Sequence, residues 1–119
     1  MKELDTFGQF IIKNLYDNPI SFYSMLENGQ WKDKDSQKLY EKIKLLPTDS
    51  KKLIHQIIIQ MLTNSLHDFL SALQEAHDFQ KGIEIMVNDS NIADKTDDMQ
   101  AGMLQGEIFD WIERFSEFT

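Results

Sequence analysis

The chain has 119 residues, of which 41% are hydrophobic and 27% charged, and it contains no cysteine. Its length predicts one domain spanning residues 1–119, and eight phenylalanines, three tyrosines and two tryptophans exclude a disordered chain. The lack of cysteine excludes disulfides, a thiolate nucleophile and sulfur-ligated zinc, and it favours a reducing compartment.

The formal net charge of −8 is distributed unevenly along the chain. Residues 1–52 contain nine lysines and eight acidic residues, whereas residues 53–119 contain three basic and twelve acidic residues. Such an acidic second half disfavours direct binding of nucleic acid, because the phosphates would be repelled. The concentration of charge instead suggests a basic partner.

The first 47 residues predict three helices. Apolar residues recur every three or four positions from Leu4 to Leu15, and Asp17-Asn18-Pro19 is expected to end this first helix. Because proline suits the first turn of a helix, residues 20–26 are expected to form a short second helix. Ser36 opens a third helix, which ends at Pro47.

The longest helical pattern runs from Asp49 to Phe79 and contains neither proline nor glycine. A continuous helix of this length would measure about 46 Å, whereas a compact domain of this size is only ~35 Å across. We therefore expect a bend or break near Thr63-Asn64-Ser65. The β-branched triplet Ile57-Ile58-Ile59 is compatible with a strand, but the apolar spacing on both sides favours a helix.

After Gly82 the period changes from helical to alternating. Ile83 to Val87 reads as a strand, and a turn at Asn88-Asp89-Ser90 leads to a return strand over residues 91–93. Short helices are expected over residues 97–104 and 107–118, the latter with Trp111 facing the interior. The predicted fold class is mainly α: a compact bundle of five or six helices with a small β-hairpin near residues 83–93.

The sequence shows no recognisable catalytic or metal-binding motif. On a continuous helix His67 and His77 would lie about 15 Å apart, too far to share a metal ion. The series Asp89, Asn91 and Asp94 begins like a calcium loop but lacks its glycine and its closing glutamate. No cofactor and no metal site are therefore expected, and the lysine-rich stretch over residues 32–52 reads as an ordinary mixed-sign surface.

The acidic residues near the C-terminus are the candidate binding site. An acidic surface accelerates association with a basic protein and repels nucleic acid that competes for the same basic cleft. Apolar anchors for such a contact would be Met99, Met103, Phe109 or Trp111, each of which also suits the core. The alternative interpretation is a solvated acidic face that keeps the protein dispersed. The candidate residues for binding this basic partner are Asp94, Asp97, Asp98, Glu107, Asp110 and Glu113.

In its length, acidity, lack of cysteine and helical character, the chain resembles the small bacterial immunity proteins that protect cells against colicins or contact-dependent growth inhibition toxins. The segments Leu66-His67-Asp68-Phe69-Leu70, Asn91-Ile92-Ala93-Asp94 and Trp111-Ile112 also resemble a pattern in uncharacterised bacterial proteins. The immunity resemblance implies a stoichiometric inhibitor that binds one basic protein toxin, often a nuclease, at or beside its active site.

Two other classes remain open. The first is a hydrolase that combines carboxylates with a histidine, and the second is a helical adaptor that oligomerises through Ile57-Ile58-Ile59 and its methionines. The N-terminus, Met1 to Asp5, lacks the features of a signal peptide, and no stretch approaches the ~20 apolar residues of a membrane span. A cytoplasmic protein that does not associate with membranes is therefore expected.

Overall fold

The protein is mainly α, as the sequence predicted. The structure, a computed structural model, describes residues 2–94 and 103–118, and 74% of it is helical. The elements in chain order are α1 (Glu3–Ile12), η1 (Lys13–Asp17), α2 (Asn18–Glu27), α3 (Lys34–Ile43), α4 (Thr48–Asp78), β1 (Met86–Val87), β2 (Ser90–Asn91), η3 (Leu104–Glu107) and α5 (Ile108–Phe115). With the uninterrupted run α1–η1–α2 counted as one helix, these ranges contain four helices and one two-stranded antiparallel sheet, so the expected number of five or six helices is not confirmed.

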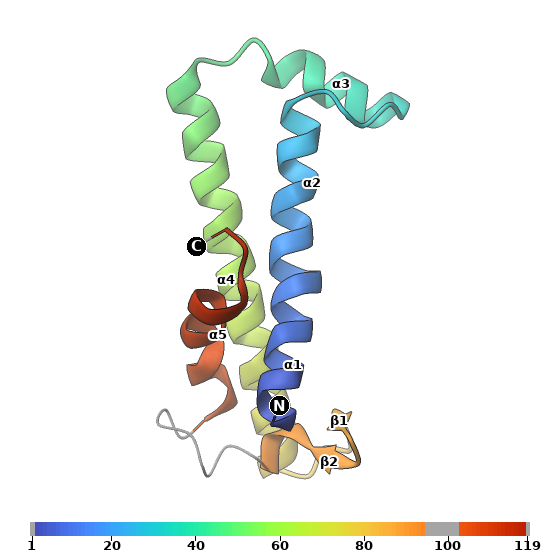
Figure 1. The fold of residues 1–119 in the computed structure, drawn as a ribbon, viewed down its shortest axis with the longest axis vertical. Helices are drawn as coiled ribbons and strands as arrows, with labels where there is room; N and C mark the ends of the chain where they lie inside the picture. The colour runs from blue at the N-terminus through green and yellow to red at the C-terminus, as the bar shows by residue number, and fades with distance from the viewer. Residues whose placement is uncertain (1, 95–102, 119) are drawn as a thin grey trace.

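The first helix does not end at Asp17-Asn18-Pro19, and this expectation was wrong. The elements α1, η1 and α2 follow one another without a break and form a single column in Figure 1. In a regular α-helix the ring of Pro19 would meet the carbonyl of Leu15. The π-helical turn η1 lies directly before the proline and widens the helix at this point, so the column continues.

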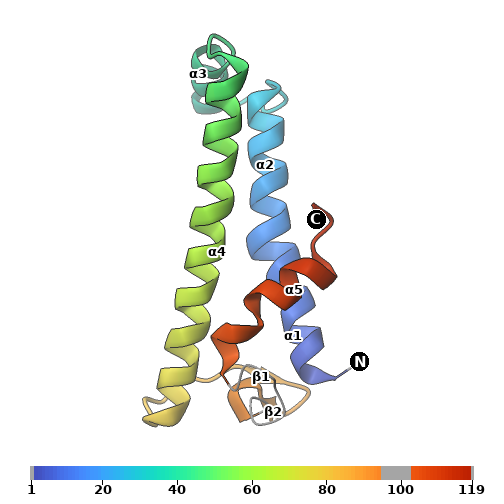
Figure 2. The same ribbon diagram turned by 90° about the vertical axis from the view of Figure 1, so that its left-hand side faces the viewer.

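The expected bend in the longest helix was also wrong, because α4 runs for 31 residues without interruption. The prediction assumed a compact domain, but the molecule measures 49 × 26 × 26 Å with a radius of gyration of 17.3 Å. A compact chain of this length would have a radius of gyration of about 13.5 Å. The molecule is elongated, and α4 lies along its long axis (Figures 1 and 2).

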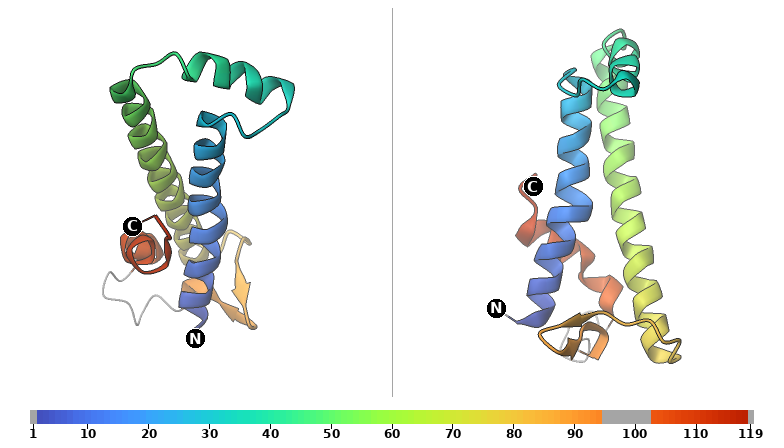
Figure 3. Two further views of the ribbon diagram at one scale, coloured as in Figure 1. Left: turned by 45° about the horizontal axis from the view of Figure 1, so that its top comes forward. Right: turned by 90° about the vertical axis from the view of Figure 1, so that its right-hand side faces the viewer.

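The third helix is shorter than predicted, and it crosses the upper end of the molecule in Figure 1. It begins at Lys34 because the Asp33 carboxylate caps it by accepting a hydrogen bond from the Ser36 amide at 3.0 Å. It ends at Ile43, three residues before the predicted end. Figure 3 shows that α3 joins α2 to α4 at one end of the molecule.

The predicted hairpin is present at the lower end of the molecule, although its strands have only two residues each. Met86 pairs with Asn91, and Val87 pairs with Ser90. Asn88 and Asp89 both have positive φ angles, of 50° and 66°, which is the conformation of a two-residue type I′ turn. The expected helix over residues 97–104 lies mostly outside the described residues, and η3 begins at Leu104.

The hydrophobic core lies almost entirely in the lower half of the molecule. It joins α1, η1, the start of α2 through Ile20, the C-terminal half of α4, η3, α5 and the residues after β2. Trp111 of α5 is fully buried, as predicted, and it packs edge-on against Phe7 with ring centroids 5.9 Å apart. On α4 the buried core residues are Leu66, Leu70 and Leu73. From the N-terminal half of the same helix, Ile59 and Leu62 pack against this core, and the first turns of the helix lie above it.

Candidate functional site

Two of the candidate acidic residues, Glu107 on η3 and Asp110 on α5, lie around a single guanidinium. Arg114 donates a hydrogen bond to Asp5 of α1 and, from Nε, another to Asp110 at 2.9 Å. Glu107 lies close enough to this group that Asp110 and Asp5 affect its ionisation. Three carboxylates therefore share one positive charge, which leaves the cluster with a net negative charge.

Burial raises the pKa of the Glu107 carboxyl, and the negative charge of Asp110 raises it further. Arg114 opposes this effect without cancelling it. Asp5 and Asp110 raise the pKa of Arg114, mainly through the hydrogen bond to Asp5. The ionised form of Glu107 is therefore destabilised relative to its protonated form in this half-buried position.

The solvent-facing side of α5 combines an exposed aromatic ring with two candidate carboxylates. The Phe109 side chain is 67% exposed, and Asp110 and Glu113 are exposed beside it. Phe109 and Glu113 are four residues apart, so they are neighbours on one face of the helix. We call Phe109, Asp110 and Glu113 the α5 face. Of the other proposed anchors, Met103 is exposed, Trp111 belongs to the core, and Met99 lies outside the described residues.

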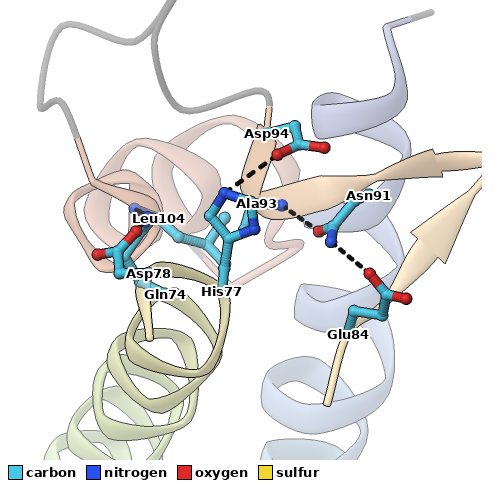
Figure 4. A network of polar contacts seen from close by, with 8 residues as sticks. All are labelled: Gln74, His77, Asp78, Glu84, Asn91, Ala93, Asp94 and Leu104. Carbon is cyan, nitrogen blue, oxygen red and sulfur yellow. Dashed lines mark hydrogen bonds and ion pairs between the residues drawn. The ribbon is translucent and has the colours of Figure 1, made fainter. Parts of the chain in front are cut away.

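Asp94 lies in a different group of contacts, shown in Figure 4. Its carboxylate is 3.0 Å from Nε2 of His77 near the end of α4. Beside this pair, the Asn91 amide donates to Glu84 at 2.7 Å and the Asn91 oxygen accepts from the Ala93 amide at 3.0 Å. His77, Glu84, Asn91 and Asp94 line an open hollow of about 420 Å³.

The structure therefore brings Glu107 and Asp110 together around Arg114, places Glu113 on the solvent-facing side of α5, and separates Asp94 from them as a second acidic group. Both groups lie in the half of the molecule opposite α3 (Figure 1). Asp97 and Asp98, the remaining two candidate residues, lie outside the described residues.

The lysine-rich stretch occupies the opposite end of the molecule from the hairpin. Its lysines lie on or beside α3 and in the first turn of α4. Their contacts are local: Lys32 donates to the Gly29 carbonyl at 2.9 Å, and Lys44 pairs with Glu41 at 2.6 Å. Positive and negative charge are thus separated along the long axis, and the stretch is a mixed-sign surface as predicted.

Sequence analysis missed two buried polar residues that hold the acidic region in place. Asp17 is only 3% exposed, and its carboxylate accepts hydrogen bonds from Ser116 Oγ at 2.6 Å and from the Glu117 amide at 3.0 Å. The Gln74 side chain accepts a hydrogen bond from the Leu104 amide at 3.0 Å where η3 begins. These partners are about 100 and 30 residues apart in the chain, so no local pattern indicates them.

The chemistry available in the hollow is that of a histidine–carboxylate pair. No serine, threonine or cysteine is among the residues that line it, so the described lining provides no hydroxyl or thiol nucleophile. Within residues 2–94 and 103–118, no group of three or more His, Cys, Asp or Glu side chains could hold a metal ion. The described helices include none with both the length and the apolar character required to cross a lipid bilayer.

Comparisons of the chain with protein-family models, with curated protein sequences and with solved structures found no match.

Proposed function

We propose that the protein is an inhibitor of the immunity type, which binds a basic protein toxin through its acidic half. The observation that supports this most directly is the exposed Phe109 ring beside Asp110 and Glu113 on α5, at a distance from the lysines around α3. An acidic face that lacked an apolar anchor would attract many cations, whereas an aromatic side chain next to the carboxylates adds shape complementarity and affinity.

The α5 face and Asp94 have different roles in this proposal. The α5 face makes the direct contact: Asp110 and Glu113 pair with lysine or arginine of the toxin, and Phe109 enters an apolar depression. Asp94, whose side chain is 60% exposed beside His77, adds to the negative field that steers the toxin towards the complex. A nuclease is a suitable target, since its cleft is basic in order to bind phosphate.

Association with a toxin tests the electrostatic part of the proposal. The probe is the C-terminal domain of the protein encoded by the reading frame immediately upstream of this chain, and the proposal expects that domain to be basic. We expect the triple variant Asp94→Asn, Asp110→Asn and Glu113→Gln to associate about 10-fold more slowly at low salt and to show a weaker dependence on salt. The matched control, Asp35→Asn, Glu41→Gln and Asp49→Asn, removes three carboxylates near the lysines and is expected to associate like the parent.

Phe109→Ala tests the anchor separately. We expect little change in the association rate and about 30-fold faster dissociation, which corresponds to the ~2 kcal/mol of a typical aromatic anchor. If both the triple variant and Phe109→Ala bind like the parent, the α5 face is not the docking site and the proposal fails.

A histidine–carboxylate hydrolase is the second candidate, and the contact between His77 and Asp94 in the hollow favours it. Such a site would use His77 to take a proton from water, oriented by Asp94. The test is hydrolysis of ester and phosphodiester substrates by the parent and by His77→Gln. Activity that survives this substitution, or that is absent from the parent, contradicts the second candidate.

A further inference from the structure

The N-terminal half of α4 presents an apolar face that no other described element covers. Leu53, Ile57 and Met61 are 56%, 48% and 63% exposed. They are four residues apart, so they lie along one side of the helix within an arc of about 80°. Figure 2 shows that α5 lies beside the lower half of the molecule only. We call Leu53, Ile57 and Met61 the α4 stripe.

The helix around this stripe carries no fixed charge. From Leu53 to His67, fifteen residues in a chain that is 27% charged, there is no Asp, Glu, Lys or Arg. An exposed helix usually carries charges on its outer side. Depletion of charge combined with large apolar and methionine side chains is instead typical of the centre of a protein interface.

The pattern of the stripe is symmetric about Ile57. Residues on this side of α4 follow at intervals of three, four, four and three: Ser50, Leu53, Ile57, Met61 and Asn64. In either direction from Ile57, a large apolar residue lies four positions away and a small polar residue lies seven positions away. A two-fold symmetric contact requires such a self-complementary surface, since each residue must fit its counterpart in the other copy.

The charges that flank the uncharged stretch favour an antiparallel arrangement. Asp68 lies eleven residues after Ile57, which places it only about 20° from the stripe, and its side chain is 85% exposed. In an antiparallel pair centred on Ile57, Asp68 reaches just beyond Thr48, where α4 of the other copy begins, so the two Asp68 side chains lie about 33 Å apart along the pair. A parallel pair would place Asp68 against Asp68, which is repulsive.

We infer that the α4 stripe is a homodimer interface, in which two copies pack their α4 helices antiparallel with Ile57 at the two-fold axis. Leu53 of each copy contacts Met61 of the other, and Ser50 lies opposite Asn64. The exposed side of α4 in the upper half of each molecule is then covered by α4 of the other copy. The strongly acidic lower halves point in opposite directions, so their repulsion is small and both α5 faces stay exposed.

Sedimentation of the full chain over a range of concentrations is the first test. We expect a monomer–dimer equilibrium, and we expect Ile57→Glu to raise the dissociation constant about 100-fold, because two like charges would be buried together at the axis. The matched control is Ile83→Glu, which places the same charge at a position that is 64% exposed in the lower half and is expected to leave the dimer intact. Circular dichroism checks that both variants keep their helices.

A charge-pair experiment tests the antiparallel register itself. Leu53→Lys and Met61→Glu each weaken the homodimer, but an equimolar mixture of the two variants is expected to form a heterodimer. In that pair the introduced lysine faces the introduced glutamate, and the parental methionine faces the parental leucine. A parallel pair would instead place each introduced charge against an apolar residue and would gain nothing on mixing.

Three results would overturn the inference. They are a parent chain that stays monomeric up to millimolar concentration, a dimer that Ile57→Glu leaves intact, and failure of the mixed variants to associate better than either alone. A monomeric parent whose stripe binds a different protein would assign the surface to another partner. Because the α5 face is not part of the stripe, loss of dimerisation and loss of toxin binding can be told apart.

Discussion

Gly8 of α1 lies directly against the indole ring of Trp111 on α5. A Cβ atom at Gly8 would stand 2.6 Å from Cε2 and 2.7 Å from Nε1 of that ring. Because Trp111 is fully buried, the ring has no solvent-exposed space into which to move. The missing side chain at position 8 therefore determines how closely the first and last helices approach.

Gly8→Ala is expected to destabilise the protein even though alanine favours helices. Forcing a methyl group into this contact costs about 1–3 kcal/mol, which exceeds the ~1 kcal/mol gained in helix propensity. Urea unfolding followed by tryptophan fluorescence measures the difference. Gln9→Ala, at the exposed neighbouring position, is the control and is expected to change the free energy of unfolding by less than about 0.5 kcal/mol.

Asp17→Ala is expected to loosen the chain after α5. The substitution leaves the Glu117 amide and the Ser116 hydroxyl without this acceptor, at a cost of about 1–3 kcal/mol. Ser116→Ala removes only one of the two hydrogen bonds to Asp17 and is expected to cost less. Amide hydrogen exchange at Glu117 measures the effect, and unchanged protection in Asp17→Ala would contradict it.

Glu107 makes stability depend on pH in a direction unusual for a carboxylate. Since its folded pKa is raised above the ordinary value of 4.5, its protonation favours the folded state. The contribution of Glu107 to the free energy of unfolding is therefore fully present below pH 4.5. It is lost as the pH rises through the raised pKa that Glu107 has in the folded state. Glu107→Gln is expected to match or exceed the parent in stability at pH 7 and to lose this advantage at pH 4. Unfolding at the two pH values, with Glu117→Gln as an exposed control, measures this difference.

Asp89→Gly is expected to stabilise the hairpin. Asp89 has a φ of 66°, which costs a residue with a Cβ atom about 1 kcal/mol, and glycine adopts this conformation without strain. The substitution creates the Asn-Gly pair that type I′ turns prefer. Thermal unfolding should show a higher midpoint for Asp89→Gly and a lower one for Asn88→Val, because a β-branched residue resists positive φ.

The periodicity of the sequence predicted the helices and the hairpin because these features depend on local spacing. Two corrections concern global shape. Pro19 indicates a helix end by local rules, but the π-helical turn before it permits continuation. The bend predicted at residues 63–65 followed from an assumed compact shape, whereas the packing that selects an elongated molecule involves residues far apart in the chain.

The candidate site was predictable in its charge but not in its arrangement. The sequence showed an acidic C-terminal region, and Asp110 was among the candidate residues that it indicated. The contact of Arg114 with Asp5 and the contact of Asp94 with His77 depend on tertiary packing. These contacts divide one acidic segment into two groups, a division that local spacing does not reveal.

The concentration of the core in the lower half implies that α4 is not equally stable along its length. Amide hydrogens near Leu70 are shielded by several packed elements, and they should exchange only through nearly global opening. Those near Ile57 have one packed side, and they should exchange through fraying of the helix from Thr48. Amide exchange would then give two different free energies of opening for the two halves of α4. Binding of a second copy to the α4 stripe would reduce the difference between them.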